Sequence, residues 1–130
     1  MQLRYESSNN ALLLTLNDDT RLPVKQIDLT GYVEMGTAGR LAGVELLEPR
    51  NTRLAQLLAR WITDDDAQEF LTVDADAAYI ELSESDAPNE PLRTAAATFR
   101  ADLDDDGQLI ALAIPRHGSG YEITYPSGNQ

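Results

Sequence analysis

The clearest signal in this chain is the amphipathic segment at residues 51–62, NTRLAQLLARWI. Its large apolar side chains recur three and four positions apart and are Leu54, Leu57, Leu58 and Trp61. This spacing places them on one face of an α-helix. Asn51 can cap the first turn, because its side-chain oxygen accepts a hydrogen bond from a backbone amide. The segment therefore predicts one helix whose apolar face needs a sheet to pack against.

Short strands and turns are predicted on both sides of this helix. The strands expected before it span residues 11–16, 24–35 and 40–47. The strands expected after it span residues 77–82, 94–101 and 108–114, with a further edge strand at 121–125. The alanine-rich segment 94–101 also suits a helix by composition, but its place before a hairpin turn favours a strand. Residues 36–39, GTAG, have the glycines of a hairpin turn.

The two sides of the helix match element by element. Residues 10–16 align with 76–82 at an offset of 66, and residues 39–46 align with 107–114 at an offset of 68. Order, spacing and polarity agree, although few residues are identical. We therefore predict an α+β fold of two antiparallel three-stranded repeats related by pseudo-twofold symmetry.

This prediction makes residues 1–130 a single domain. Its parts are repeats at 1–50 and 70–116, a connecting helix at 51–62 whose body is 52–62, and a C-terminal tail at 117–130. The tail supplies the extra edge strand.

Each half resembles the YuzE-like family, small bacterial proteins for which no activity is established. The family pattern opens with a Tyr-Asp-x-x-x-Asp-Ala-Leu-Tyr-Ile strand, continues into an acidic turn with glycine, and closes with a Gly-Ile-Glu-Ile strand. The second half keeps the first two parts at residues 73–80 and 102–107 and departs from the third at 111–114. The first half keeps the third part at residues 43–46 but has GTAG at the turn. The resemblance implies two diverged tandem copies of one fold and no particular reaction.

Composition excludes several classes of function. The chain has 22 acidic and 10 basic residues and a net charge of −12, which argues against binding nucleic-acid phosphates or anionic membranes. It has no cysteine, so disulfides, thiolate catalysis and cysteine metal sites are excluded. The N-terminal region lacks the apolar core of a signal peptide, and its longest apolar run, residues 11–14, is too short to cross a bilayer. We expect a soluble cytoplasmic protein.

The strongest candidate for a binding site is the acidic turn at residues 102–107. Asp102, Asp104 and Asp106, followed by glycine, match the D-x-D-x-D-G opening of a calcium loop, and this spacing suits Ca²⁺ or Mg²⁺. The twelfth position of an EF-hand needs a bidentate glutamate, and here it carries Ala113 with no flanking helices. A solvated hairpin turn explains the same residues and is the favoured interpretation.

Other chemically active residues have ordinary structural interpretations. Residues 64–66, three aspartates, fit a solvated acidic run. His117 is the only histidine and lies two residues from Ser119 on a glycine-rich segment, which is poor geometry for a nucleophile and its base. Trp61 is expected in the core or at an interface. No catalytic site and no cofactor are predicted.

Two functions from different classes remain. The first is a non-enzymatic scaffold or protein-interaction module, because catalytic groups are missing, the surface is acidic and strand edges can pair with a partner. Its partner would be a basic protein or a second copy of the chain. The second is a weak divalent-cation-binding protein that uses Asp102, Asp104 and Asp106.

Overall fold

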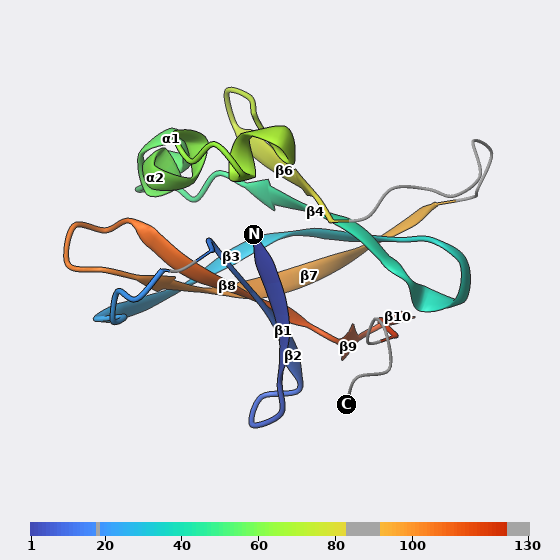
Figure 1. Cartoon of the computed structure of the whole chain (residues 1–130). Coiled ribbons are helices and arrows are strands. Elements are labelled where there is room, and N and C mark those ends of the chain that lie inside the picture. The colour runs from blue at the N-terminus through green and yellow to red at the C-terminus, as the bar shows by residue number, and fades with distance from the viewer. Residues whose placement is uncertain (18, 83–91, 125–130) are drawn as a thin grey trace.

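The chain folds into one large curled sheet. The structure is a computed structural model that describes residues 1–17, 19–82 and 92–124. It is mostly β, with 53% strand and 12% helix, and eight antiparallel strands form a half-barrel (Figure 1). The prediction of an α+β fold with two three-stranded repeats is therefore wrong. Each half adds a fourth strand, and all eight strands join a single sheet.

The sheet takes four strands from each half of the chain. The first half supplies β1 (Gln2–Glu6), β2 (Ala11–Thr15), β3 (Lys25–Met35) and β4 (Leu41–Leu47). The second half supplies β5 (Leu71–Val73), β6 (Ala77–Glu81), β7 (Arg93–Leu103) and β8 (Leu109–Pro115). The strand predicted at 94–101 is confirmed by β7. The short edge strands β1 and β5 are the ones that the three-stranded prediction leaves out.

The strand order is palindromic with respect to the two halves. It runs β1-β2-β8-β7-β3-β4-β6-β5, so replacing each strand by its counterpart in the other half reverses the same order. β2 pairs with β8, and its counterpart β6 pairs with β4. Strands of each half therefore pair with strands of the other half, and neither half contains a complete sheet.

The register of the two central strands is symmetric in the same way. β3 and β7 pair over eleven residues, and Thr30 faces Thr98 at the middle of the pairing. These two threonines are 68 positions apart, the offset that also separates Lys25 from Arg93 at the strand starts. The pairing of β3 with β4 shifts register between Glu34 and Met35, and the pairing of β7 with β8 shifts at the same offset, between Asp102 and Leu103. The strand order and the pairing register are therefore both consistent with a twofold relation between the halves.

The predicted helix forms as two short helices, α1 (Leu54–Leu57) and α2 (Ala59–Ile62). Leu58 separates them with φ −99° and ψ 12°. Asn51 does not cap them: the N-cap residue is Arg53, and the Leu54 amide donates a hydrogen bond to Glu48 Oε2 at 3.1 Å. A carboxylate suits the positive end of a helix, but Glu48 lies six residues before Leu54 and so is not at an N-cap position. In the ranges that the structure describes, no helix is long and apolar enough to cross a membrane.

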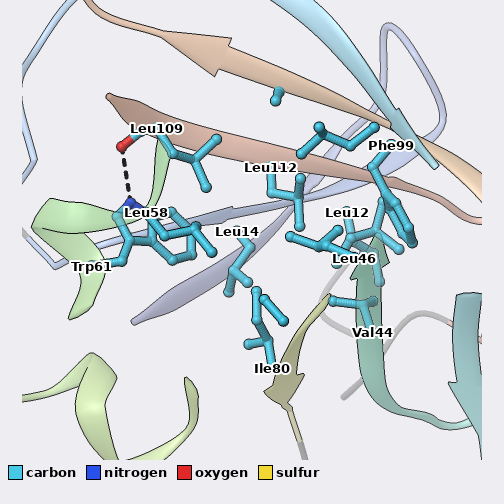
Figure 2. Close-up of a cluster of buried hydrophobic side chains, with 14 of the residues drawn as sticks. Leu12, Leu14, Val44, Leu46, Leu58, Trp61, Ile80, Phe99, Leu109 and Leu112 are labelled. Carbon is cyan, nitrogen blue, oxygen red and sulfur yellow. Dashed lines mark hydrogen bonds between the residues drawn. The ribbon is translucent and has the colours of Figure 1, made fainter. Parts of the chain in front are cut away.

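The predicted apolar face of the helical segment is confirmed. Leu54, Leu57, Leu58 and Trp61 are each at most 1% exposed. Figure 2 shows Leu58 and Trp61 against leucines of β2 and β8, inside the curl of the sheet. Burying each such side chain contributes about 2 kcal/mol. The indole Nε1–H of Trp61 donates to the Leu109 carbonyl at 2.9 Å, which satisfies its one polar atom.

The C-terminal segment does not extend the main sheet. β9 (His117–Gly118) and β10 (Tyr121–Glu122) form a separate two-stranded hairpin. Ile123, directly after it, is fully buried in the core, and Thr124 bridges to Arg40. The predicted edge strand is thus the second strand of a short hairpin, and the buried side chain of Ile123 follows it. Residues 125–130 of the predicted tail lie outside the described part of the chain.

The curl brings the two edges of the sheet toward each other. Met1 and Leu3 on the β1 side line a cavity of about 120 Å³ together with Phe70 and Leu82 on the β5 side. A glycine contributes to this shape: a Cβ at Gly31 would collide with the backbone carbonyl oxygen of Glu45 on β4. β3 and β4 therefore approach more closely at this point than any larger residue allows.

We expect Gly31→Ala to destabilise the fold by about 1–3 kcal/mol, because backbone has to move to admit the methyl group. The exposed neighbour Thr30→Ala should change stability by no more than about 0.5 kcal/mol. Urea unfolding followed by tryptophan fluorescence measures both. Equal stability of Gly31→Ala and wild type would show that the close approach does not constrain the sheet.

Candidate functional site

The candidate site lies on the solvent-exposed face of the two central strands. Side chains alternate along β3, so that Leu29 and Val33 are buried whereas Thr30 and Tyr32 are exposed. We call the exposed side the outer face. The residues opposite Thr30 and Tyr32 on β7 are Thr98 and Ala96, which are also exposed.

An open groove of about 530 Å³ crosses the outer face at the centre of the sheet. Thr30 and Tyr32 of β3 and Ala96 and Thr98 of β7 line it, and the hairpin β9–β10 lines another part through residues such as Tyr121. The residues of the lining are hydroxyl-bearing, small or apolar, with one histidine. Its volume falls in the range of ligand sites, but the groove is open, and its described lining residues include no acid–base pair.

The groove runs beside an unpaired length of β7. β3 pairs with β7 as far as Arg93, whereas β8 pairs with it only from Arg100 to Leu103. Residues 93–99 therefore have no strand on the β8 side within the part of the chain that the structure describes. A free edge of this kind presents backbone N–H and C=O groups to an added strand.

Acidic and aromatic side chains continue the outer face beyond the groove. Tyr32 on β3 faces Glu45 on β4, and Glu45 in turn faces Tyr79 on β6. The next row has Glu34 on β3 and Glu81 on β6, on either side of a glycine of β4. We call Tyr32, Glu34, Glu45, Tyr79 and Glu81 the acid–tyrosine patch.

Tyr79 joins the two rows of this patch. Its ring lies over Gly43, where a Cβ would collide with it, and its hydroxyl donates to Glu34 Oε1 at 2.5 Å. Burial, the hydrogen bond to Glu34 and the charges of Glu34, Glu81 and Glu45 raise the pKa of the Tyr79 hydroxyl. Tyr79 therefore stays protonated, and the patch keeps its negative charge from three carboxylates.

The structure separates Asp102 from the other two predicted metal ligands, Asp104 and Asp106. Asp102 lies within β7, where Arg100 Nε donates to its Oδ1 at 3.1 Å. The ligand oxygens that come within 4.8 Å of one another belong to Asp104, Asp105 and Asp106. The D-x-D-x-D spacing assumes one continuous loop, but β7 continues to Leu103 and so includes Asp102.

Asp104 closes the turn and binds a cationic side chain. Its Oδ1 accepts hydrogen bonds from the amides of Asp106 and Gln108, both at 2.9 Å, and its Oδ2 accepts one from Arg21 Nη1 at 2.6 Å. Burial raises the pKa of this carboxyl, but the hydrogen bonds from Gln108, Arg21 and Asp106 outweigh it, so the pKa is lowered. Sequence reasoning missed Arg21, because no local pattern links residues 83 positions apart.

The turn is also docked on the helices. Gln108 Nε2 donates to the Gln56 carbonyl at 2.7 Å, and Arg60 Nη2 lies 3.3 Å from Asp106 Oδ2. The equivalent turn in the first half has no acids, yet its Gly39 has the same φ of 76° as Gly107. The hairpin shape therefore does not require the aspartates. Their observed partners are arginines and backbone amides.

The remaining candidates have structural partners. The Nδ1 atom of His117 lies 3.0 Å from Asn10 Nδ2, an amide donor, and among the described residues no acid or hydroxyl bonds to this histidine. Asp64 Oδ1 accepts from the amides of Asp66 and Ala67 at 3.0 Å and so caps the 3₁₀ turn η2 (Ala67–Glu69). Within the acidic run, Asp64 thus has a local structural role, whereas Asp66 Oδ2 accepts a hydrogen bond from the N-terminal ammonium group of Met1 at 2.9 Å.

Comparisons of the chain with protein-family models, with curated proteins and with solved structures found no match. The geometry of the groove, the patch and the acidic turn is therefore the basis for assigning a function.

The lowered pKa of Asp104 predicts a pH-dependent contribution to stability. Because this pKa is lower in the folded chain than in the unfolded chain, the carboxylate stabilises the fold above about pH 4, and the contribution is lost as the pH falls through the folded-state pKa. We expect Asp104→Asn to lose about 1–3 kcal/mol at pH 7. The gap from wild type should narrow on acidification toward pH 3.

Thermal unfolding at several pH values measures this gap. Asp105→Asn is the matched control, since it changes the same charge in the same turn at an exposed residue. A gap for Asp104→Asn that stays constant from neutral to acid pH would contradict the assignment.

Proposed function

We propose that this protein is a non-enzymatic protein-interaction module whose binding surface is the central groove of the outer face. The observation that carries the proposal is the free edge of β7 at residues 93–99, which lies beside an open groove whose described lining residues include no carboxylate, lysine or arginine. Sheet edges of this kind bind extended segments through their backbone. The protein would act in the cytoplasm, and its partner would be another protein or a second copy of the chain.

Two further features support recognition rather than catalysis. Tyr32 is 40% exposed at the floor of the groove, and exposed tyrosines are common anchors at protein interfaces. The hydroxyl groups of Thr30 and Thr98 lie on the same face without a neighbouring base among the described residues. This arrangement can bind a partner, but it lacks the paired groups of acid–base or nucleophilic chemistry.

The alternative, a weak divalent-cation site, depends on Asp104, Asp105 and Asp106. A cation there would have to compete with Arg21, which forms an ion pair with Asp104 at 2.6 Å. Asp105 and Asp106 are exposed and would lose solvation on binding. The geometry therefore favours the interaction module over cation binding.

Calorimetric titration with Ca²⁺ and with Mg²⁺ tests this preference. We expect no binding heat and no shift in melting temperature with either ion, because Asp104 is held by Arg21. Binding by the wild type that Asp104→Ala abolishes would overturn the preference and restore the cation-binding function.

The twofold relation of strand order and register supports a proposal about origin. The two halves would descend from one four-stranded unit that was duplicated and fused. The resemblance of each half to the YuzE-like family then concerns that ancestral unit, and it rests on the sequence motifs of residues 43–46, 73–80 and 102–107.

A photo-crosslinking amino acid at Thr98 tests the proposed function in the native host. We expect a specific adduct from Thr98, which lines the groove, and none from the same substitution at Thr72, an exposed threonine of β5. Adducts of equal yield at both positions, or none at Thr98, would remove the groove as the binding surface.

A further inference from the structure

We propose that the groove binds an extended cationic peptide segment as an added strand along residues 93–99 of β7, with lysine or arginine side chains reaching the acid–tyrosine patch. This inference rests on the proposed function and names the mode of binding and the chemistry of the partner.

The backbone of β7 supplies the docking edge. β7 and β3 pair over eleven residues, whereas β8 (Leu109–Pro115) has seven and leaves β7 before Phe99. Pro115 ends β8 and has no amide hydrogen to donate. An added strand would therefore continue the sheet where β8 departs, between β7 and the hairpin that lines the groove.

The side chains of β7 on the outer face are small enough for a ligand side chain to pass over them to β3. Thr94, Ala96 and Thr98 are the outer-facing residues of the free edge, and the first two face Glu34 and Tyr32 on β3. Neighbouring strands lie about 4.8 Å apart, so a side chain of the added strand has to cross one strand to reach β3. A lysine or arginine is long enough to do so over alanine and threonine, but not over a large residue.

Charge and aromatic character identify the occupant as cationic. Glu34 and Glu45 flank Tyr32 on the outer face, and Glu81 lies beyond them. In the described part of the chain no ion pair joins these three carboxylates to a basic side chain. An exposed tyrosine beside carboxylates offers a guanidinium or ammonium group both a cation–π contact and an opposite charge. An acidic peptide would meet repulsion at the same place.

The matching half-edge of β3 lacks these features. The outer-facing residues at its free end are Gln26 and Asp28, and across from them on β7 are Asp102 and Arg100. Arg100 there forms ion pairs with Asp102 at 3.1 Å and with Glu6 at 3.3 Å. By the 68-residue offset, Gln26 and Asp28 stand in the places of Thr94 and Ala96, and Arg100 stands in the place of Tyr32. A lysine from a strand added beside β3 would have to cross these longer side chains, and it would meet an ion-paired arginine instead of an exposed tyrosine. Only the half-edge of β7 therefore fits the proposed ligand.

Fluorescence anisotropy with short labelled peptides tests the proposal. The probe alternates lysine and threonine, and its control carries glutamate at each lysine. We expect the full-length wild-type protein to bind the lysine peptide and to bind the glutamate peptide at least about tenfold more weakly. Glu34→Gln should weaken lysine-peptide binding by about threefold, whereas Glu69→Gln, an equal charge change at an exposed residue outside the patch, should not.

N-methylated peptides test the strand-addition mode without altering the protein. Methyl groups on alternate amides block one edge of an extended peptide and leave the other edge free. Methylation on the edge that faces β7 should cost about tenfold in affinity or more, since several backbone hydrogen bonds are lost. Methylation on the opposite edge should cost much less. Equal effects of the two patterns would overturn strand addition.

The outcomes separate this inference from the proposed function. If Thr98 crosslinks a partner but the lysine peptide fails to bind or binds no better than the glutamate peptide, the interaction module stands and its cationic occupant is overturned. If the lysine peptide binds equally well to Glu34→Gln and wild type, the acid–tyrosine patch is not its contact.

Discussion

The pairing of β3 with β7 is the interaction on which the rest of the structure depends. It joins the two halves through eleven residue pairs centred on Thr30 and Thr98. Every other strand is placed from this pair, since β4 and β8 flank it and β6 and β2 follow. Because β2 pairs with β8 and β6 with β4, a half alone would leave unpaired edges inside its own sheet. The two halves therefore share one sheet and one core.

The two halves of the symmetric sheet are followed by different segments, which contribute different side chains to the core. The helices α1 and α2 bring Trp61 to the core after the first half, whereas the segment after the second half brings Tyr121 and Ile123. The two equivalent turns differ in the same way. The turn at Asp104 is held by Arg21, and the turn at Ala38 accepts a hydrogen bond from Thr124 Oγ1 at 2.7 Å. Each half thus uses different side chains to fix the same backbone.

The candidate binding surface follows from a mismatch of strand lengths within this frame. Two long central strands lie between two shorter neighbours, so in the described part of the chain each long strand keeps a half-edge with no paired strand. On β7 the half-edge carries small residues, and the hairpin β9–β10 lies against it to form the groove. On β3 the half-edge carries Gln26 and Asp28, and Arg100 with its ion pairs lies across from Asp28 on β7. The groove and the small residues beside it therefore occur at only one of the two equivalent half-edges of a nearly symmetric sheet.

The sequence by itself determined the local features. Helical spacing identified the buried face of Leu54, Leu57, Leu58 and Trp61, and the place before a hairpin identified the strand at 94–101, because both depend on neighbouring residues. Tertiary structure alone decided that eight strands form one sheet, since pairing partners far apart in the chain compete on equal local terms. It also decided the cap from Glu48, the Arg21–Asp104 ion pair and the groove, because each joins segments whose distance in space no local pattern encodes. The 68-residue offset was the one signal that could have placed Thr30 opposite Thr98.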